Sequence, residues 1–188
     1  KHNIDGDRPF ILAVSRYDVH KNQATIIKAF KKMKKMSSVQ KQKPMLIIVG
    51  NSASDDPEGM SMYQEIVREI DGDEDIYPLL NIENNDTNIG ALMSLASCFV
   101  HVSTKEGFGL VVTEAMWQGA PIIGSAVGGI KQQVVSGNNG FLVEPYEVDR
   151  IATLMERLLT NKEEQEEMGQ NSVETVRNHF LLPRLIYK

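Results

Sequence analysis

Short apolar runs alternate along this chain with longer segments whose apolar residues recur at helical spacing. This alternation constrains the fold more than any other feature. Most of the runs are rich in β-branched residues, and they are expected to be strands at residues 10–15, 45–50, 76–80, 98–103, 121–126 and 140–145. Runs that are apolar almost throughout are typical of strands covered on both faces, as in a parallel sheet.

The segments between these runs are expected to be helices. After Asn22, a candidate N-cap, apolar residues recur every three or four positions while lysines occupy the opposite face. Further helices are expected at residues 60–70, 87–96, 110–118, 130–135, 147–159 and 163–180. This order predicts an α/β fold: a Rossmann-like, doubly wound, mostly parallel six-stranded sheet with helices on both faces. Ligands of such sheets bind beyond the carboxyl ends of the strands.

Composition argues against several classes of function. The chain has 188 residues and a net charge of −5, which disfavours a general affinity for nucleic acid. Eight lysines and no acidic residue lie between residues 19 and 54, and a solvated helix surface explains them more simply than a membrane- or polyanion-binding face. The single cysteine, Cys98, requires no oxidising compartment, and no apolar run approaches the ~20 residues of a membrane span. We therefore expect a cytoplasmic protein without membrane contact.

Several common site motifs are missing from the sequence. The first strand–helix turn lacks G-x-G-x-x-G, and the chain contains neither a P-loop nor a G-x-S-x-G elbow. Its four histidines are scattered without metal-ligand spacing, so no metal and no cofactor are expected. His101 is expected to be a partnered core or rim residue rather than a catalytic base. We expect Cys98 to be buried and Trp117 to serve packing.

The stretch "STKEGFGLVVTEAMWQGAPIIGSAVGG", residues 103–129, contains the strongest candidate site. Gly107 and Gly109 remove side chains from the approach to a helix that begins near Leu110, so the free N–H groups of its first turn form a candidate phosphate cradle. Glu114 lies one turn inside the helix and leans back toward the cradle, where a ribose diol would suit it. Glu106, on the loop, could accept hydrogen bonds from sugar hydroxyls.

Two other interpretations of this pair of carboxylates remain open. Glycoside hydrolysis needs one protonated carboxyl group facing a second carboxylate, but a helix N-terminus favours the ionised form of Glu114. Alternatively, Glu106 and Glu114 have no function, since acidic residues are common in first helical turns.

A second cluster, "SRYDVHKN", follows the first strand. Arg16 offers a fork of donors and Lys21 a point charge, a combination that suits a diphosphate. The alternative is two ordinary surface cations. Both this loop and the Glu106 loop are expected to open at the carboxyl edge of the sheet, which favours a shared site.

Together these residues resemble a known family, the retaining GT-B glycosyltransferases of the glycogen-synthase-like and sucrose-synthase-like branch (family four). The resemblance covers essentially the whole chain and includes "VSRYDVHKN", "KEGFGLVVTEAMWQGAPIIGS" and "AVGGIKQQVVSGNNGFLVEP". It implies that Arg16 and Lys21 hold the leaving diphosphate, that Glu106 binds the donor sugar and that Glu114 binds the ribose. It also implies donor contacts from the loop and first helical turn, at Gly107, Phe108, Gly109, Leu110 and Val111. Asn22 departs from the glycine usual in the family after the lysine.

A narrower resemblance concerns the substrate. "DDPEG", "EAMWQG" and "AVGGIKQQ" are similar to trehalose glycosyltransferring synthases and retaining trehalose phosphorylases. The expected function is transfer of a hexose, with glucose favoured, from a nucleoside-diphosphate sugar to a sugar acceptor. A phosphorylase using glucose 1-phosphate, a non-catalytic sugar-nucleotide-binding module and a flavodoxin-like signalling domain remain as alternatives.

The resemblance also implies a domain organisation. Residues 1–8 would be an interdomain linker, residues 9–180 the C-terminal nucleotide-sugar-binding domain, and residues 181–188 the truncated start of a crossover helix. The N-terminal acceptor domain would be the missing partner, so this fragment alone is expected to be inactive. The base of the nucleotide stays open, and so does a homo-oligomeric state.

Overall fold

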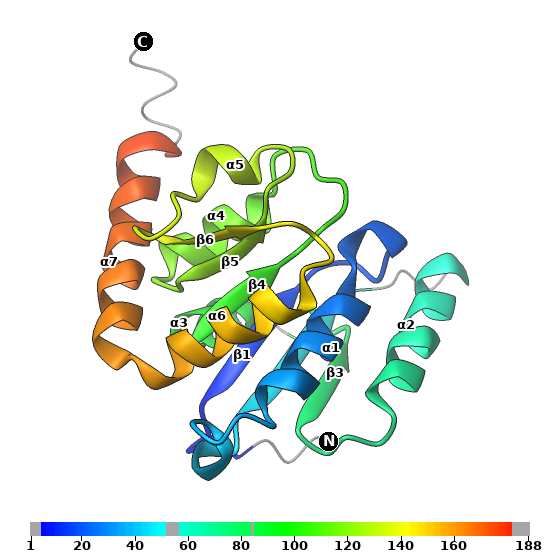
Figure 1. Ribbon diagram of the computed structural model, residues 1–188. Coiled ribbons are helices and arrows are strands. Elements are labelled where there is room, and N and C mark those ends of the chain that lie inside the picture. The colour runs from blue at the N-terminus through cyan, green and yellow to red at the C-terminus, as the bar shows by residue number, and fades with distance from the viewer. Residues whose placement is uncertain (1–4, 52–56, 84, 182–188) are drawn as a thin grey trace.

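The computed structural model describes residues 5–51, 57–83 and 85–181, and its centre is a parallel six-stranded sheet (Figure 1). The strand order is β3-β2-β1-β4-β5-β6, the doubly wound order in which the chain reverses direction across the sheet between β1 and β4. The strands are β1 (Phe10–Val14), β2 (Met45–Gly50), β3 (Ile76–Leu80), β4 (Cys98–His101), β5 (Ile122–Ser125) and β6 (Gly140–Val143). The predicted fold class is confirmed.

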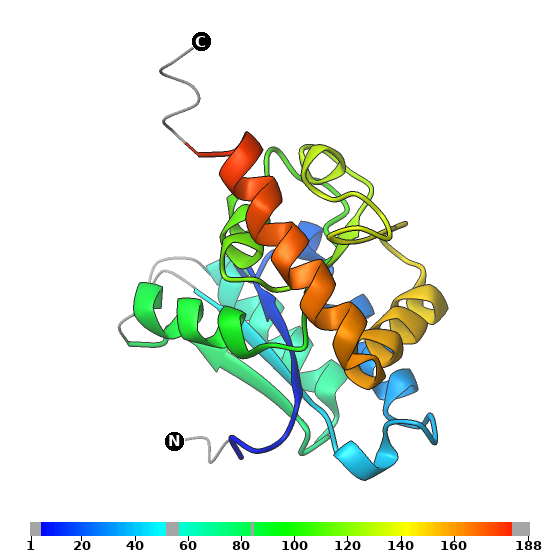
Figure 2. The same ribbon diagram turned by 90° about the vertical axis from the view of Figure 1, so that its left-hand side faces the viewer.

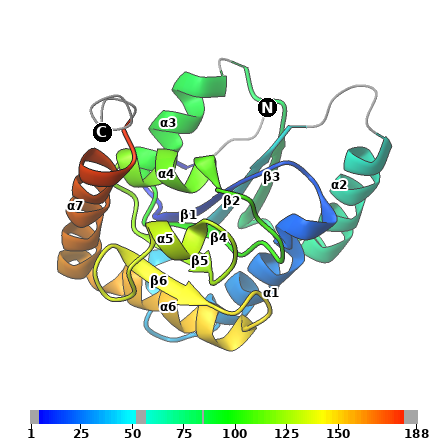
Figure 3. The same cartoon turned by 90° about the horizontal axis from the view of Figure 1, so that it is seen from above.

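Helices cover both faces of this sheet, as the view from above shows (Figure 3). One face carries α1 (Gln23–Met33), α2 (Pro57–Ile70) and α6 (Val148–Thr160). The other carries α3 (Asn85–Leu95), α4 (Leu110–Trp117), the short α5 (Ile130–Gln133) and α7 (Lys162–His179). Two 3-10 turns, η1 (Val19–Lys21) and η2 (Gln40–Gln42), flank α1. Helix α7 packs against α4 and α6 and crosses the molecule in Figure 2.

Both faces of the strands are buried, which explains why their sequences are apolar almost throughout. On β1, Ile11 and Ala13 pack beneath α1 and α6, whereas Leu12 and Val14 belong to the core on the opposite face. Cys98 is fully buried on the same face as Ile11, as predicted. Burial of apolar side chains in two separate cores is the main favourable contribution to folding here.

The lysine-rich segment is tied to neighbouring elements. Lys32 pairs with Asp149 at the start of α6, and Lys34 lies 2.6 Å from both Asp73 and Asp75 before β3. Lys31 donates to a backbone carbonyl at the end of α2. These contacts join helix α1 to elements on either side of it.

Asn22 precedes α1 as predicted, but its side chain does not cap the helix. Its backbone is left-handed, with φ of 54°, and its amide nitrogen donates instead to the carbonyls of Val102 and Pro145 at 3.1 and 2.8 Å. The predicted N-cap position is therefore confirmed, but the side-chain hydrogen bond usual for an asparagine cap is not made. The left-handed backbone suits glycine or asparagine, so Asn22 fits a position where the resembled family usually has glycine.

The ends of several elements differ from those predicted. Strand β4 ends at His101, although Val102 and Ser103 are also buried, because its pairing with β5 runs only as far as His101 and Gly124. Of the predicted domain boundaries, residues 1–4 and 182–188 lie outside the described residues, as do the two aspartates of the "DDPEG" stretch, whose last three residues begin α2. Among the described residues, no helix is long and apolar enough to cross a membrane.

Candidate functional site

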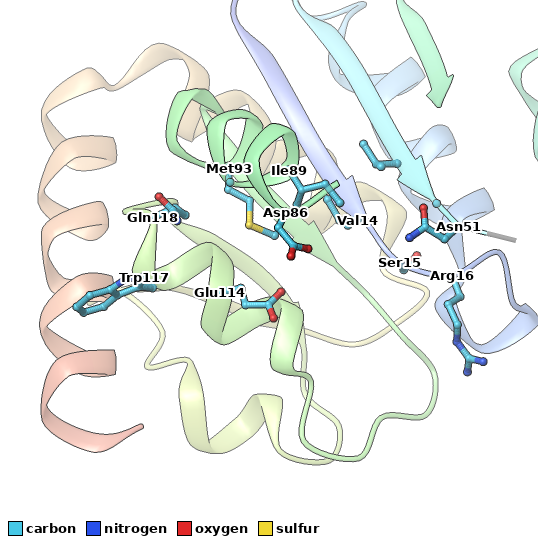
Figure 4. A pocket seen from close by; sticks show the side chains of 13 residues that line it. Val14, Ser15, Arg16, Asn51, Asp86, Ile89, Met93, Glu114, Trp117 and Gln118 are labelled. Atoms are coloured by element: carbon cyan, nitrogen blue, oxygen red, sulfur yellow. The ribbon is translucent and has the colours of Figure 1, made fainter. Parts of the chain in front are cut away.

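A pocket of about 400 Å³ lies at the carboxyl edge of the sheet, where the connections after β1 and β2 approach α3 and α4 (Figure 4). This is the edge at which doubly wound sheets bind ligands, beside the β1–β4 switch point. The floor is apolar, with Val14, Val49, Ile89 and Met93 among its residues. Its polar and charged residues are Ser15, Arg16, Asn51, Asp86, Glu114 and Gln118.

Arg16 and Glu114 line this pocket from opposite sides. Glu114 projects from α4 and its carboxylate points into the space between α4 and α3, as does that of Asp86 (Figure 4). Arg16 follows β1, and its side chain is 76% exposed and lies 3.7 Å from Asp18, a long ion pair. A guanidinium held this loosely can turn toward an anion in the pocket.

Lys21 and Glu106 form a separate cluster beside the glycine loop. Lys21 Nζ lies 2.7 Å from Glu106 Oε2, and both side chains are largely buried, at 16% and 13% exposed. The same carboxylate oxygen lies 2.8 Å from His101 Nε2. Neither Lys21 nor Glu106 is among the residues of the pocket wall. The two predicted cations therefore have different neighbours in this structure: Lys21 pairs with Glu106, whereas Arg16 is a lining residue of the pocket whose side chain is mostly exposed to solvent.

This cluster stabilises the ionised form of Glu106. The hydrogen bond from His101 and then the hydrogen bond and charge of Lys21 lower the pKa of the Glu106 carboxyl from 4.5 to about 2, against the opposing effect of burial. Glu106 is therefore an acceptor of hydrogen bonds at neutral pH. A glycosidase acid needs the opposite shift, so the hydrolytic interpretation loses its candidate acid in Glu106.

The glycine loop leads directly into α4. Gly109 is the residue before the helix, and its φ of 83° is a backbone conformation that disfavours residues other than glycine. At Gly107 the space is open, because a side chain there would meet nothing within 4 Å. The first N–H groups of α4, at Leu110 and Val111, lie where a helix leaves such groups without an internal partner. Phe108 is partly exposed, and its ring packs edge-on against Phe180, 5.8 Å between centroids.

The glycine loop is held in place by hydrogen bonds from residues after β5, which were not predicted to be part of the site. Gly129 donates its N–H to the Gly107 carbonyl at 2.7 Å, and the fully buried Gln133 donates to the Phe108 carbonyl at 2.5 Å. At Gly128, a Cβ would overlap the Glu106 carbonyl. The "GG" dipeptide after the fifth strand was a usable signal, because glycine is required where two backbones come this close.

Other site residues could not have been found from spacing. Asp86 in the first turn of α3 and Gln118 after α4 face the same pocket only because of the strand order. Trp117 is 43% exposed and is among the residues that line the pocket, but its ring points away from Glu114 and toward α7 (Figure 4), so its role in packing stays a prediction. His101 is 3% exposed and hydrogen-bonded, as predicted for a partnered core histidine. Within the described residues, no three His, Cys, Asp or Glu side chains gather where they could hold a metal ion.

Comparison with known proteins identifies relatives of this arrangement. Residues 1–175 match the family model "Glycosyl transferases group 1". The chain is 38% identical to a trehalose synthase from Rubrobacter xylanophilus, over 97% of this chain and 42% of that protein. It is 29% identical to a trehalose phosphorylase from Pleurotus sajor-caju, over 77% of this chain and 21% of the relative.

A solved structure shares the fold. The sucrose-phosphate synthase from Thermosynechococcus elongatus superimposes with a TM-score of 0.84 and 28% identity, covering 98% of this chain and 44% of that one. The chain thus spans less than half the length of these relatives. The resemblance inferred from the sequence motifs is confirmed, and the chain belongs to the glycosyl transferases group 1 family.

Proposed function

We propose that this chain is the donor-binding half of a retaining glycosyltransferase that moves a hexose, with glucose favoured, from a nucleoside-diphosphate sugar to a sugar acceptor. The observation that carries the proposal is that Arg16 and Glu114 line the same pocket, with the ionised Glu106 beside the neighbouring glycine loop. In this proposal Glu114 receives the ribose hydroxyls and Arg16 the diphosphate, because carboxylates accept from diols and guanidinium groups donate to phosphates.

The sugar would lie over the glycine loop, between the pocket and the Lys21–Glu106 cluster. Glu106, ionised and facing the loop, would accept hydrogen bonds from sugar hydroxyls, and the N–H groups from Phe108 to Val111 would donate to sugar and phosphate oxygens. The rate gain would come mainly from cations and N–H groups that stabilise negative charge on the departing diphosphate. This proposal needs neither a protein nucleophile nor a metal ion.

The acceptor is proposed to be glucose, with trehalose as the product. Support comes from the relatives named trehalose synthase, which cover nearly the whole chain. A retaining trehalose phosphorylase that uses glucose 1-phosphate is the second candidate, favoured by the weaker match to relatives of that name. We propose that an N-terminal acceptor domain completes the site, and that the 188-residue chain alone transfers nothing. The cytoplasmic location also remains a proposal.

Calorimetric titration of the chain with UDP, ADP, GDP and their glucose conjugates tests the proposal. Replacing Arg16 with Ala or Glu114 with Gln should weaken binding about tenfold to a hundredfold, since hydrogen bonds to charged groups contribute about 1.5–3 kcal/mol. Matched controls are Arg150→Ala, on the exposed side of α6, and Glu163→Gln, in the first turn of α7. Binding of none of the six ligands would contradict the proposal, as would equal losses in the controls.

A second titration separates the two candidate reactions. A phosphorylase should bind glucose 1-phosphate as well as it binds any glucose nucleotide, whereas a synthase should favour a nucleotide. Assays of sugar transfer in a longer protein that contains this chain then distinguish an enzyme from a binding module.

A further inference from the structure

His101 is a polar residue at the end of a buried parallel strand. Its side chain is 3% exposed, and its ring lies parallel to that of Phe99, with 6.3 Å between centroids. Burial of an imidazole is costly unless its nitrogens are hydrogen-bonded, so its contacts must offset that cost. The contact that distinguishes it from a packing residue is the one to Glu106.

The contacts of Glu106 are divided unequally between its two oxygens. Oε2 lies 2.8 Å from His101 Nε2, 2.7 Å from Lys21 Nζ and 3.4 Å from Ser103 Oγ. Oε1 accepts one hydrogen bond, from the N–H of Gly107 at 3.2 Å. A carboxylate oxygen can accept two or more hydrogen bonds, so Oε1 retains capacity for a ligand.

The arrangement is not a nucleophile relay. Ser103 Oγ approaches the same ring nitrogen, Nε2, at 3.0 Å, whereas a relay of the Ser-His-acid type uses opposite nitrogens. Because an ionised carboxylate only accepts hydrogen bonds, we assign the ring proton at Nε2 and its direction toward Glu106. His101 is thus a donor to Glu106.

Lys21 cannot hold Glu106 and a diphosphate equally well. Its ammonium group sits on a flexible stem of four carbons, and under the proposed function it must turn toward the diphosphate when the donor binds. The imidazole of His101 is fixed by burial on strand β4 and its ring stacks on Phe99. A donor on a rigid strand keeps its geometry better than one on a mobile stem.

We propose that His101 is a positioning residue that holds Oε2 of Glu106, so that Oε1 faces the hydroxyls of the donor sugar while Lys21 turns to the diphosphate. This inference rests on the proposed function, because it assigns the sugar to Glu106. It predicts that His101 affects recognition of the sugar and leaves recognition of the nucleoside diphosphate unchanged. A merely structural histidine would affect both ligands alike.

The test compares UDP with UDP-glucose, by calorimetric titration of the chain and its variants. His101→Leu removes the donor at similar volume, and the affinity for UDP-glucose should fall about tenfold while that for UDP stays within about twofold. His101→Gln, whose amide can donate to Oε2, should restore most of the affinity for UDP-glucose. Equal losses for both ligands, or no loss for UDP-glucose, would overturn the proposal.

A double-mutant cycle tests whether His101 acts through Glu106. In a Glu106→Gln background, His101→Leu should cause no further loss of UDP-glucose affinity, because the carboxylate that it positions is gone. A full additional tenfold loss would show that His101 acts by another route. If His101→Leu fails to fold, His101→Met takes its place in both tests, since methionine also lacks the N–H donor and fills a similar volume.

The titrations with UDP and UDP-glucose separate the role of His101 from the donor-binding function of the chain. If the unmodified chain binds neither UDP nor UDP-glucose, and none of the other nucleotides, then the proposed function itself fails. If it binds both and His101→Leu binds both unchanged, the donor-binding function stands and the role of His101 falls.

Discussion

Gly128 lies against the main chain of Glu106 so closely that a Cβ added to Gly128 would be 2.0 Å from the Glu106 carbonyl oxygen. Gly128 also has φ of 49°, in the left-handed region that favours glycine. The turn after β5 therefore sets the position of the loop that carries Glu106. A substitution at Gly128 should therefore displace the loop that carries Glu106, even though Gly128 itself contributes no side chain to the site.

Gly128→Ala is expected to destabilise the chain by about 2 kcal/mol or more, because its methyl group would overlap backbone atoms that cannot move independently. Chemical denaturation followed by circular dichroism measures the change. Gly107→Ala is the control in the same loop, since a Cβ there meets nothing within 4 Å, and its stability should change by less than about 1 kcal/mol. Equal stability of the two variants would contradict the close approach at Gly128.

The Glu106 carboxyl is expected to titrate near pH 2, far below 4.5, because His101 and Lys21 stabilise its ionised form. Carbon-13 NMR of the labelled side chain measures this directly. His101→Leu should raise the pKa of Glu106 toward its ordinary value, since the hydrogen bond from His101 is the largest cause of the shift. A Glu106 pKa that stays the same in this variant would show that Lys21 alone accounts for the shift.

The same shift makes part of the stability dependent on pH. A carboxyl whose pKa is lower in the folded state contributes stability that is fully present above the unfolded pKa and is lost as pH falls through the folded pKa. The stability difference between the unmodified chain and Glu106→Gln should thus be constant above about pH 5 and should shrink between pH 4.5 and about 2. Urea denaturation at several pH values checks it, with Glu163→Gln as a surface control. A difference that grows on acidification would contradict the assigned sign.

Asn22 should reverse the usual ranking of alanine and glycine. Both Asn22→Gly and Asn22→Ala lose the hydrogen bonds to Val102 and Pro145, but only alanine is strained at φ of 54°. The alanine variant is therefore expected to be about 1 kcal/mol less stable than the glycine variant. At Asn171, inside α7, the order should be opposite by about the same amount, because glycine weakens a helix interior. Thermal denaturation of the four variants measures these stability differences. The same order of alanine and glycine at both positions would be incompatible with a left-handed backbone at Asn22.

Gly50, at the end of β2, provides the space for the buried ring of Tyr17. A Cβ at Gly50 would lie 2.3 Å from a ring carbon of Tyr17, whose hydroxyl donates to the Leu79 carbonyl at 3.1 Å. Gly50→Ala should cost about 1–3 kcal/mol through overpacking, and much less in a Tyr17→Leu background. Denaturation of the single and double variants measures this coupling, with Gly6→Ala as a control in open space. Strict additivity would show that the ring and the added methyl group do not meet.

The sheet could be predicted because covering both faces of a strand demands apolar residues at nearly every position, as in Met45–Gly50. Strand ends were less predictable, since Val102 and Ser103 remain buried beyond the last paired residue of β4. Apolar composition reports burial, whereas the end of a strand is decided by where a neighbour stops pairing. Helix α3 likewise begins at Asn85, slightly before the expected residue 87.

From the sequence, only those features of the site could be predicted that depend on residue type and on position in a loop. Arg16 and Glu114 have the residue types and loop positions that a phosphate and a diol require, and the structure brings both to one pocket. The ion pair between Lys21 and Glu106 depends on β1 lying next to β4, which no local pattern encodes. The same holds for Asp86, which reaches the pocket from a third connection.

The pocket lined by Arg16 and Glu114 and the cluster of Lys21 and Glu106 have no residue in common. A single molecule that touched both would have to extend across the glycine loop, with its two ends fitted by different side chains. A substitution that reshapes the fit at one end would then leave the side chains at the other end in place.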